Sequence, residues 1–413
     1  MKKLLTALML LLLAAPAGFA QDDKPSVFLL SFNDFGVTSI FSVAMVDALQ
    51  AYGYIEPTDR EAMDQDEGPG SLVIEAPEAS KLELHRHFVD FQLDQIRGMV
   101  AAALDNDPDV LVTLSAPVTL AAVHATLDLP DPPAIFFADV QNLFDTGIAD
   151  ASCIKPAHVT GVESATYYGE ILDLLLLQYP DLKSIGTLHD SGDASGIHGA
   201  SQITELGEAQ GITVIQTAIN SLADLPLAMD ALVSKDVEAV LLPLDNTLSA
   251  GLPIIATIAN DAGIPIFSTG VDGSWFGAIV GAGSLEYYAL GEQIGAMVAA
   301  YLNGELNPAT TGIAQQSAYS LGVFVNMITA DMLELDISPA LQERADASIS
   351  LVEDEPFLMP TSELGMSTLR QARFGPTMSL EEREARDRAF LARLTCTPER
   401  IAEQQAELDA MEG

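Results

Sequence analysis

The sequence reads AIFFADV at residues 134–140, HVTGV at 158–162, SIGTLHDSGDAS at 184–195, ITVIQTAI at 212–219, VEAVLLPLDNT at 237–247, IPIFSTGVDG at 264–273 and AIVGAG at 278–283. Most of these short apolar segments are separated by segments long enough for a helix. Such an alternation predicts β-α units around a parallel sheet, and therefore an α/β protein. Three of the segments end in the polar loops HDSGDAS, LPLDNT and STGVDG. In an open parallel sheet these loops share the carboxyl edge, where ligands bind.

The same alternation continues on both sides of this stretch. Upstream, the sequence predicts a strand at 26–32, a helix at 39–52 and a buried strand at 109–114. Downstream, a helix at 288–303 and a strand at 320–325 close the body of the protein.

The part of the chain after residue 340 differs in character. Residues 350–375 show no hydrophobic periodicity. Ser379-Leu380-Glu381-Glu382 forms a capping box that predicts a helix to about Leu394, and Thr397-Pro398 starts a second helix to about Met411. We therefore expect a C-terminal extension over residues 340–413 that contains a small helical hairpin.

The N-terminus has the layout of a secretory signal peptide. Lys2 and Lys3 precede an apolar core from Leu4 to about Ala15, and small residues lead up to Ala20, where cleavage is expected. The apolar core is too short for a membrane span, and no later stretch of about 18 uncharged apolar residues follows it. We therefore expect residues 1–20 to be removed and the mature protein to be periplasmic, without direct insertion into the membrane.

The charge balance is strongly acidic, with 59 Asp and Glu residues against 18 Lys and Arg residues. Such an excess argues against nucleic acid and against an anionic membrane surface as partners. It has two readings, an acidic site for a cation or a surface adapted to saline surroundings, and we favour the second.

Cys153 and Cys396 are the two cysteines of the chain. In an exported protein two thiols are more often paired than free. We therefore predict a disulfide between them, which would pin the C-terminal hairpin near a crossing between domains. The alternative is that the two cysteines are distant and Cys396 pairs with another molecule.

At HDSGDAS, LPLDNT and STGVDG the chain resembles the extracytoplasmic solute-binding proteins of ABC importers, in particular the subset whose members bind tryptophan or tyrosine. Tyr287-Tyr288-Ala289-Leu290-Gly291 matches a Y-Y-x-L-G segment of that subset, and Pro243-Leu244-Asp245-Asn246-Thr247 is the most specific match. The resemblance covers about residues 25–338. It implies a type I periplasmic-binding fold, in which two doubly wound parallel-sheet lobes are joined by a hinge and close on the ligand.

The resemblance also implies how the lobes divide the chain. We expect lobe 1 to comprise residues 25–155 and 286–317, and lobe 2 to comprise residues 156–285 and 318–338. The C-terminal extension lies outside the resemblance.

The polar loops of lobe 2 supply the first candidate ligand-binding residues. Ser191, Asp193 and Ser195, with the backbone amides near the start of the following helix, suit an anion such as a carboxylate. The alternative is an ordinary helix cap by Asp193. Asp245 suits a ligand ammonium group and Asn246 its orientation, with a helix cap again as the alternative.

The third loop departs from the family pattern, because Gly270 stands where an aspartate is usual. Thr269 and Asp272 are the candidates there. Two alternatives follow: Asp272 substitutes for the missing carboxylate, or the ligand lacks the α-ammonium group and is not an amino acid. The strand ends of lobe 1 contribute further candidates, among them a phenylalanine that can stack on a flat ligand: Phe35, Ser115, Ala116 and Asp139.

A metal site and an enzyme active site are both disfavoured by the sequence. His189, Asp190, Asp193 and His198 have the ligand chemistry for zinc, but their placement does not favour a metal site. The sequence lacks a nucleophile elbow, a phosphate loop and a dinucleotide fingerprint. We therefore expect no metal, no cofactor and no enzymatic activity.

These observations predict the solute receptor of an ABC importer. It would be a monomer that binds a small organic molecule, carboxylate-bearing in the favoured case, with an amino-acid-like ligand as one possibility. It would deliver this ligand to a membrane permease with a separate ATPase. One alternative, motivated by the C-terminal extension, is a ligand sensor that docks on a membrane receptor or kinase. Another is an exported enzyme built on the same fold.

Overall fold

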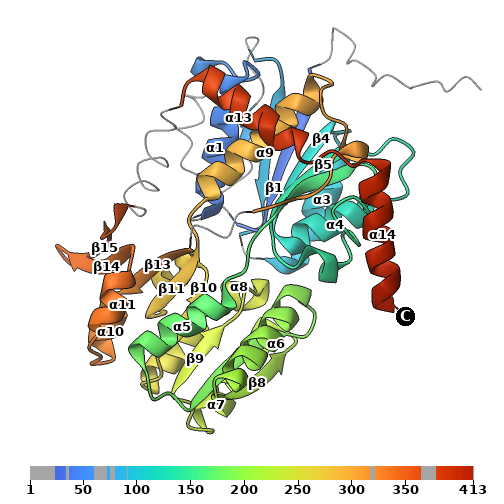
Figure 1. The fold of residues 1–413 in the computed structure, drawn as a ribbon. Coiled ribbons are helices and arrows are strands. Elements are labelled where there is room, and N and C mark those ends of the chain that lie inside the picture. Colours follow the sequence, from blue (N-terminus) through green and yellow to red (C-terminus); the bar gives the residue numbers. More distant parts are fainter. Residues whose placement is uncertain are drawn as a thin grey trace, which may run out of the picture.

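The computed structural model describes residues 24–33, 37–59, 72–74, 80–90, 92–316, 321–363 and 378–412. Two α/β lobes face each other, and the C-terminal helices lie against the first of them (Figure 1). The predicted signal peptide and Phe35 lie outside the described residues. No helix in the described part of the chain combines the length and the apolar character that a bilayer crossing requires.

Lobe 1 is built on a seven-stranded sheet of order β12-β6-β5-β4-β1-β3-β2, in which all pairs are parallel except β2 with β3. The strands are β1 (Ser26–Ser31), β2 (Leu72–Ile74), β3 (Glu83–Phe88), β4 (Val110–Leu114), β5 (Ala134–Val140), β6 (Val159–Glu163) and β12 (Ala314–Gln315). Helices pack against both faces: α1 (Val37–Ala51) and α9 (Tyr287–Leu302) on one, α3 (Ile96–Leu104) and α4 (Ala116–Thr126) on the other. β4, with sequence VLVTL, is buried at every position because helices cover both of its faces.

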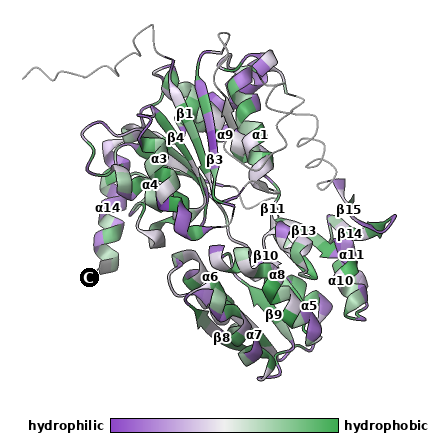
Figure 2. Cartoon of the chain, turned by 180° about the vertical axis from the view of Figure 1, so that it is seen from behind, coloured by the Kyte–Doolittle hydropathy of each residue, from purple (hydrophilic) through white to green (hydrophobic). Residues whose placement is uncertain are grey.

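Lobe 2 is built on an eight-stranded sheet of order β15-β14-β13-β11-β10-β9-β7-β8. The strands are β7 (Ser184–Asp190), β8 (Thr213–Ile219), β9 (Ala239–Leu242), β10 (Ile266–Thr269), β11 (Val280–Ser284), β13 (Leu321–Asn326), β14 (Ala347–Val352) and β15 (Glu355–Pro360). One face carries α5 (Tyr168–Gln178), α6 (Ala194–Ala209), α10 (Met327–Met332) and α11 (Pro339–Arg344), and the other carries α7 (Leu225–Val233) and α8 (Asn246–Asp261). Figure 2 shows that the central strands of both sheets are mostly apolar. The predicted α/β class with two parallel-dominated sheets is confirmed.

The structure moves two boundaries of the predicted lobes. At the C-terminal end, β14 and β15 join the sheet of lobe 2, although residues 340–413 were expected to form the extension. β6 belongs to the sheet of lobe 1, although residues 156–285 were expected in lobe 2. The strand lies between β5 and β12, and Val159 and Val162 enter the two apolar cores on opposite faces of that sheet. The chain therefore first passes to lobe 2 after Glu163. It returns to lobe 1 before α9.

A β-hairpin, β14–β15, extends the sheet of lobe 2 where the sequence shows no periodicity. β15 is the outer strand, and its register pairs Ala347 with Pro360 while Thr361 N donates to Asp346 O. In this register the odd-numbered residues of β15 point their N–H groups toward β14. Pro356 and Pro360 therefore face outward, where an N–H would otherwise be free, and they protect the edge against pairing with another sheet.

The C-terminal extension forms two helices, α13 (Leu380–Ala392) and α14 (Pro398–Glu412), at the predicted positions. The capping box is present, since Ser379 Oγ accepts from Glu382 N and the Glu382 carboxylate accepts from Ser379 N. The two helices do not fold back on each other as the expected hairpin would. α13 lies over α1 and α9, whereas α14 runs down the side of lobe 1 (Figure 1).

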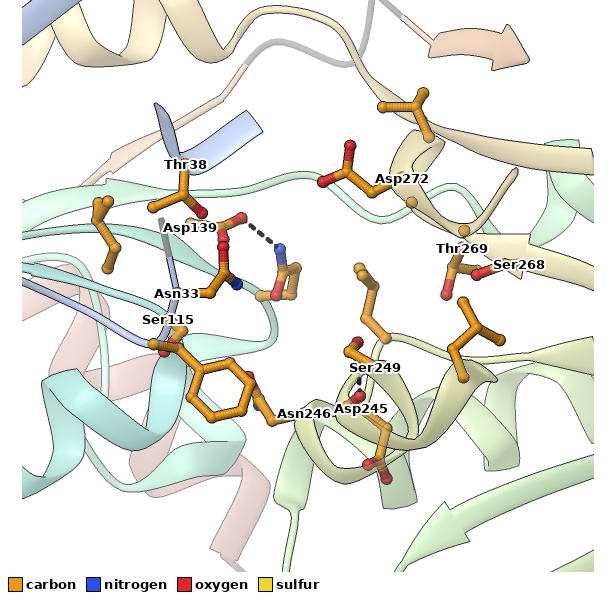
Figure 3. A pocket seen from close by; sticks show the side chains of 18 of the residues that line it. Asn33, Thr38, Ser115, Asp139, Asp245, Asn246, Ser249, Ser268, Thr269 and Asp272 are labelled. Atoms are coloured by element: carbon orange, nitrogen blue, oxygen red, sulfur yellow. Dashed lines mark hydrogen bonds between the residues drawn. The ribbon is translucent and has the colours of Figure 1, made fainter. Parts of the chain in front are cut away.

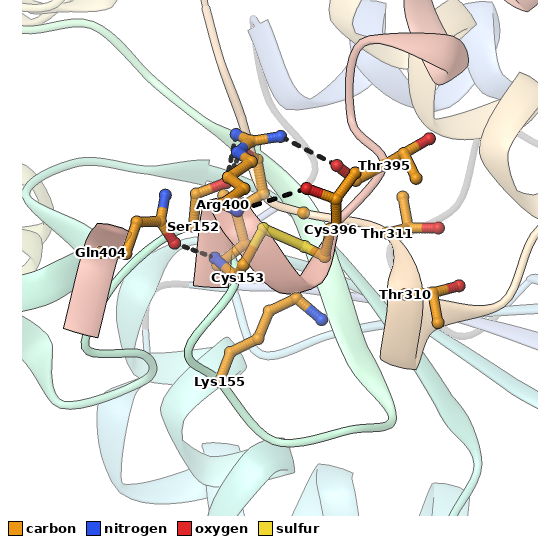
Figure 4. The surroundings of a disulfide bond; sticks show 12 residues. Ser152, Cys153, Lys155, Thr310, Thr311, Thr395, Cys396, Arg400 and Gln404 are labelled. Carbon is orange, nitrogen blue, oxygen red and sulfur yellow. Dashed lines mark hydrogen bonds between the residues drawn. A yellow bond between two sulfur atoms is a disulfide. The ribbon is translucent and has the colours of Figure 1, made fainter. Parts of the chain in front are cut away.

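Among the attachments that hold the extension to lobe 1 are a disulfide and a buried ion pair. The structure joins Cys153 to Cys396 by a disulfide, with the Cα atoms 5.6 Å apart (Figure 4). On α13, Arg383 Nη1 lies 2.6 Å from Glu292 Oε1, and Arg386 Nη1 lies 2.8 Å from Glu292 Oε2. The Arg383 and Glu292 side chains are only 3% and 6% exposed, so this ion pair is buried.

Candidate functional site

A cavity of about 150 Å³ lies between the lobes, at the carboxyl ends of the strands of both sheets (Figure 3). Both lobes contribute polar side chains to its lining. The polar and charged lining residues are Asn33, Thr38, Ser115, Asp139, Gln141 and Tyr287 from lobe 1, with Asp245, Asn246, Ser249, Ser268, Thr269, Asp272 and Ser284 from lobe 2. The volume suits a small molecule, since a cavity of about this size accommodates benzene.

The two lobes touch each other beside the cavity. Ala250 of α8, in lobe 2, packs against the apolar core of lobe 1 that contains Leu143. α6 of lobe 2 also contacts the short helix η2 (Leu143–Thr146) of lobe 1. The structure therefore shows the lobes in contact beside the cavity, which lies between them and is partly open to solvent.

Three helices begin at the cavity. Thr38 lies in the first turn of α1, Ala116 begins α4 and Asn246 begins α8, and all three line the cavity. The free backbone N–H groups and the dipole of a helix N-terminus favour a bound anion. Two of these helices, α1 and α4, belong to lobe 1. The third, α8 of lobe 2, is capped, because Asn246 N donates to Asp193 and Leu248 N donates to Asp245. The helices of lobe 1 are therefore the candidates for holding an anion.

Ser115 caps α4 in an unusual way. Its φ of 77° lies in the left-handed region, which costs a residue other than glycine roughly 1–3 kcal/mol. Its Oγ is buried and makes no hydrogen bond to the described residues. Strain of this kind clusters at ligand sites, because the surrounding fold maintains it. The predicted candidate Ser115 therefore lies at the cavity with an unused hydroxyl.

The charged lining residues are all acidic. Asp139, Asp245 and Asp272 line the cavity, and the described lining includes no Lys, Arg or His. Asp139 Oδ1 accepts from Tyr287 Oη at 3.1 Å and from Gln141 Nε2 at 3.3 Å, and burial raises the pKa of its carboxyl group. A cationic group is therefore the expected occupant of this part of the cavity.

Asp245 was predicted to pair with a ligand ammonium group, and the structure shows the alternative, a helix cap. Its side chain is 3% exposed, Oδ1 accepts from Leu248 N at 2.9 Å, and Oδ2 accepts from Asp190 N at 2.7 Å. Figure 3 shows the carboxylate turned away from the cavity. Asp245 contributes mainly its backbone to the lining.

The loop of Ser191, Asp193 and Ser195 lies outside the cavity lining. Asp193 Oδ1 accepts from Ser195 N at 2.9 Å, so the amides expected to hold an anion are already capped. Its Oδ2 accepts from Asn246 N at 3.0 Å and thereby holds the first residue of α8 in place. Ser191 Oγ donates to the exposed Asn220 side chain. This loop positions α8, and its contact with a ligand stays a prediction.

Sequence reasoning missed several lining residues. Tyr287 was noted only as part of a family segment, although it is the first residue of α9 and lines the cavity. Thr38 carried no signal, since it belongs to no polar loop at a strand end, and Ser268 was passed over although it begins the polar loop STGVDG. Among the described residues, no group of three or more His, Cys, Asp or Glu is arranged to hold a metal ion.

Comparison with known proteins assigns the family. The model of the ABC transporter substrate binding protein family matches residues 92–349, more than half of the chain. This chain is a member of that family. A curated relative, the tyrosine-binding protein of Clostridioides difficile (strain R20291), is 22% identical over 222 residues, which cover 52% of this chain and 63% of the relative. The match thus spans less than two thirds of that relative's length.

Solved structures confirm the fold of this substrate-binding family member. A conserved domain protein from Vibrio cholerae superposes with a TM-score of 0.65 at 22% identity, covering 79% of this chain and 100% of that chain. The ABC domain from Streptococcus pneumonia, solved in complex with L-Trp, superposes with a TM-score of 0.63 at 19% identity, covering 78% and 100%. The two-lobed fold is therefore shared with these two solved structures.

The buried carboxyl group of Asp245 predicts a pH dependence of stability. Burial, together with the nearby Asp193 carboxylate, raises the pKa of Asp245 to about 7. The folded protein therefore retains a proton that the unfolded chain, with its ordinary pKa of about 4, has released. The free energy of unfolding should fall as the pH rises from about 4 to about 7. Asp245→Asn should make this pH dependence shallower, by up to the contribution of about one bound proton.

Chemical denaturation at several pH values between about 4 and about 8 tests this expectation. Asp107→Asn is the control, because Asp107 is exposed and distant from the cavity lining. An Asp245→Asn variant with the slope of the wild type would show that this group does not titrate in that range.

Proposed function

We propose that this protein is the solute receptor of an ABC importer, and that it captures a small amino-acid-like molecule between its lobes. The observation that carries the proposal is the cavity between the lobes, lined by strand ends and helix starts of both lobes. A ligand there contacts both lobes only when they are closed, so binding shifts the hinge equilibrium toward the closed form. The closed receptor then delivers its ligand to a membrane permease that a separate ATPase drives.

The lining chemistry supports a ligand with both a carboxylate and an ammonium group. The N-termini of α1 and α4 suit the carboxylate, whereas that of α8 is already capped by Asp245 and Asp193. The acidic side chains suit the ammonium group. Phe32, Leu252 and Phe276 add apolar surface for the rest of the molecule. Because one relative is named for tyrosine and a structural neighbour was solved with L-Trp, aromatic amino acids are the first ligands to test.

The proposal extends to where the receptor works and in what form. We infer an exported, periplasmic protein that acts as a monomer, without a cofactor and without catalytic turnover. The predicted signal peptide supports the location, and the acidic excess of the chain suits a soluble protein that must not adhere to anionic membrane surfaces.

Thermal unfolding in the presence of each proteinogenic L-amino acid tests the proposal. At about 100 times its dissociation constant, a ligand specific for the folded state should stabilise the protein by roughly 2.7 kcal/mol. Solution scattering at the same concentration should show a smaller radius of gyration than that of the free protein, and an unchanged scattering profile would count against binding between the lobes.

A pair of tryptophan substitutions provides the control. Ser249 is exposed at the cavity, so Ser249→Trp should block the cavity and abolish the stabilisation. Ser201 is exposed on α6 away from the lining, so Ser201→Trp should leave it intact. The amino-acid proposal fails if no amino acid stabilises the wild type and native mass spectrometry finds none in the purified protein.

A further inference from the structure

We propose that Asp139, held by Tyr287 and Gln141 on lobe 1, is the residue that recognises the ammonium group of the ligand. The inference rests on the proposed function and names the specificity-determining residue within that same cavity. It assigns recognition of the cation to lobe 1, whereas the sequence alone favoured carboxylates of lobe 2.

The backbone presents Asp139 to the cavity at a local cost. Its φ is 55°, in the left-handed region that residues other than glycine rarely adopt. The pairing of β5 with β6 shifts register between Phe137 and Val140, so Asp139 lies in an irregularity of the bulge type. Bulges re-aim side chains next to binding sites, and here the re-aimed side chain is a carboxylate that lines the cavity.

The partners of Asp139 orient it without neutralising it. Tyr287 Oη and Gln141 Nε2 both donate to the same oxygen, Oδ1, at 3.1 and 3.3 Å. Both donors are uncharged, and no Lys, Arg or His belongs to the described lining. Burial and the Asp139 charge raise the pKa of Tyr287 well above its usual range, so Tyr287 remains a neutral donor. A carboxylate oriented in this way lacks a cation among the lining residues, and a ligand ammonium group would supply one.

The two other lining carboxylates fit this role less well. Both oxygens of Asp245 accept backbone hydrogen bonds, which leaves its carboxylate committed to capping α8. Asp272 lies across the cavity in the short helix η4 (Val271–Phe276) of lobe 2. Neither has a left-handed φ, whereas Asp139 combines such a φ with a cavity position. Asp272 is therefore the competitor that the experiment must exclude.

The test compares Asp139→Asn, Asp272→Asn and Tyr287→Phe with the wild type by calorimetric titration. The probes are the amino acid that stabilises the wild type most, the amine that remains when its carboxyl group is removed, and the acid that remains when its amino group is removed. For L-tyrosine these are tyramine and 3-(4-hydroxyphenyl)propionate. Asp107→Asn is the control, because Asp107 also has a left-handed φ of 51° but is exposed and outside the cavity lining.

We expect Asp139→Asn to weaken binding of the amino acid and of its amine by about 30-fold or more, the loss typical of truncating one side of a buried charge pair. Binding of the deaminated acid should not weaken, because that probe has no ammonium group. Asp272→Asn should weaken binding of the amine by less than about 10-fold. Tyr287→Phe should cost about 2-fold to 10-fold, as for one neutral hydrogen bond.

The melting temperature of the ligand-free protein provides a second readout. If Asp139 serves the ligand, Asp139→Asn removes a buried charge and should raise that temperature. A variant that melts lower and loses the amine and the deaminated acid equally would overturn the assignment, because Asp139 would then be a structural residue. Unchanged amine binding by Asp139→Asn would overturn it as well. A wild-type protein that binds no amino acid and no amine overturns the proposed function together with this inference.

Discussion

Replacing Arg383 with methionine should lower the free energy of unfolding by about 3–5 kcal/mol, the range for breaking a buried ion pair by removing one partner. Arg383 and Glu292 are almost fully buried, and their charged atoms approach to 2.6 Å. Removal of the guanidinium group leaves the Glu292 carboxylate between α9 and α13 with Arg386 as its remaining partner, and Arg386 is one-third exposed. We expect a loss near the lower end of the range, because Arg386 retains its contact.

Urea denaturation of Arg383→Met measures this loss, and Arg388→Met is the matched control. Arg388 lies on the exposed face of the same helix, so its substitution should change the free energy of unfolding by no more than about 0.5 kcal/mol. The double variant Glu292→Leu/Arg383→Met should recover part of the stability, because no buried carboxylate is left unpaired there. Equal unfolding of Arg383→Met and the wild type would show that α13 is not docked through this pair.

Removal of the disulfide should cost about 2–4 kcal/mol, the usual contribution of a native bridge. Cys153 and Cys396 are 243 residues apart in the sequence, so the bond closes a long loop of the unfolded chain. Beside the bond, α14 makes two hydrogen bonds to lobe 1: Cys153 N donates to Gln404 Oε1 at 2.8 Å, and Arg400 Nη2 donates to Ser152 Oγ at 3.1 Å. The variant Cys153→Ser/Cys396→Ser should therefore have a lower melting temperature, and a protease should cleave its C-terminal extension before the rest of the chain.

Reductant supplies the control for this prediction. It should lower the melting temperature of the wild type and leave the double serine variant unchanged. Titration of thiols in the unfolded, unreduced wild type decides whether the bond exists in solution. Two reactive thiols per chain would contradict the bridge.

The sequence was sufficient to predict those features that depend on short-range patterns. The alternation of β7 to β11 with their helices follows from local periodicity, and the capping box at Ser379 needs only residues within one helical turn. The strand β3 was missed, because helical spacing of apolar residues was expected from His85 onward. β6 was assigned to the wrong lobe because sheet membership depends on distant partners, here β5 and β12. The β14–β15 hairpin was missed because proline is rare within strands. It is tolerated at the outer edge of a sheet, where Pro356 and Pro360 lie.

In the candidate site, too, some features could be predicted from local sequence and others depended on distant parts of the fold. The rule that ligands bind at the carboxyl ends of parallel strands predicted Ser115, Asp139, Asn246, Thr269 and Asp272, and all of them line the cavity. The rule does not say which way a side chain turns. A carboxylate after a strand can face the cavity or cap the following helix, and the choice for Asp245 and Asp193 depended on backbone amides brought close by the fold.

The position of the chain's one tryptophan gives the receptor an intrinsic optical reporter. Trp275 lies in η4 beside Phe276, which lines the cavity, and its side chain is 37% exposed. Indole emission moves to shorter wavelength as water leaves its surroundings. Because no second indole dilutes the signal, rapid-mixing fluorescence can time the movement of lobe 2 without an attached dye, and the rate can then be compared with that of ligand uptake.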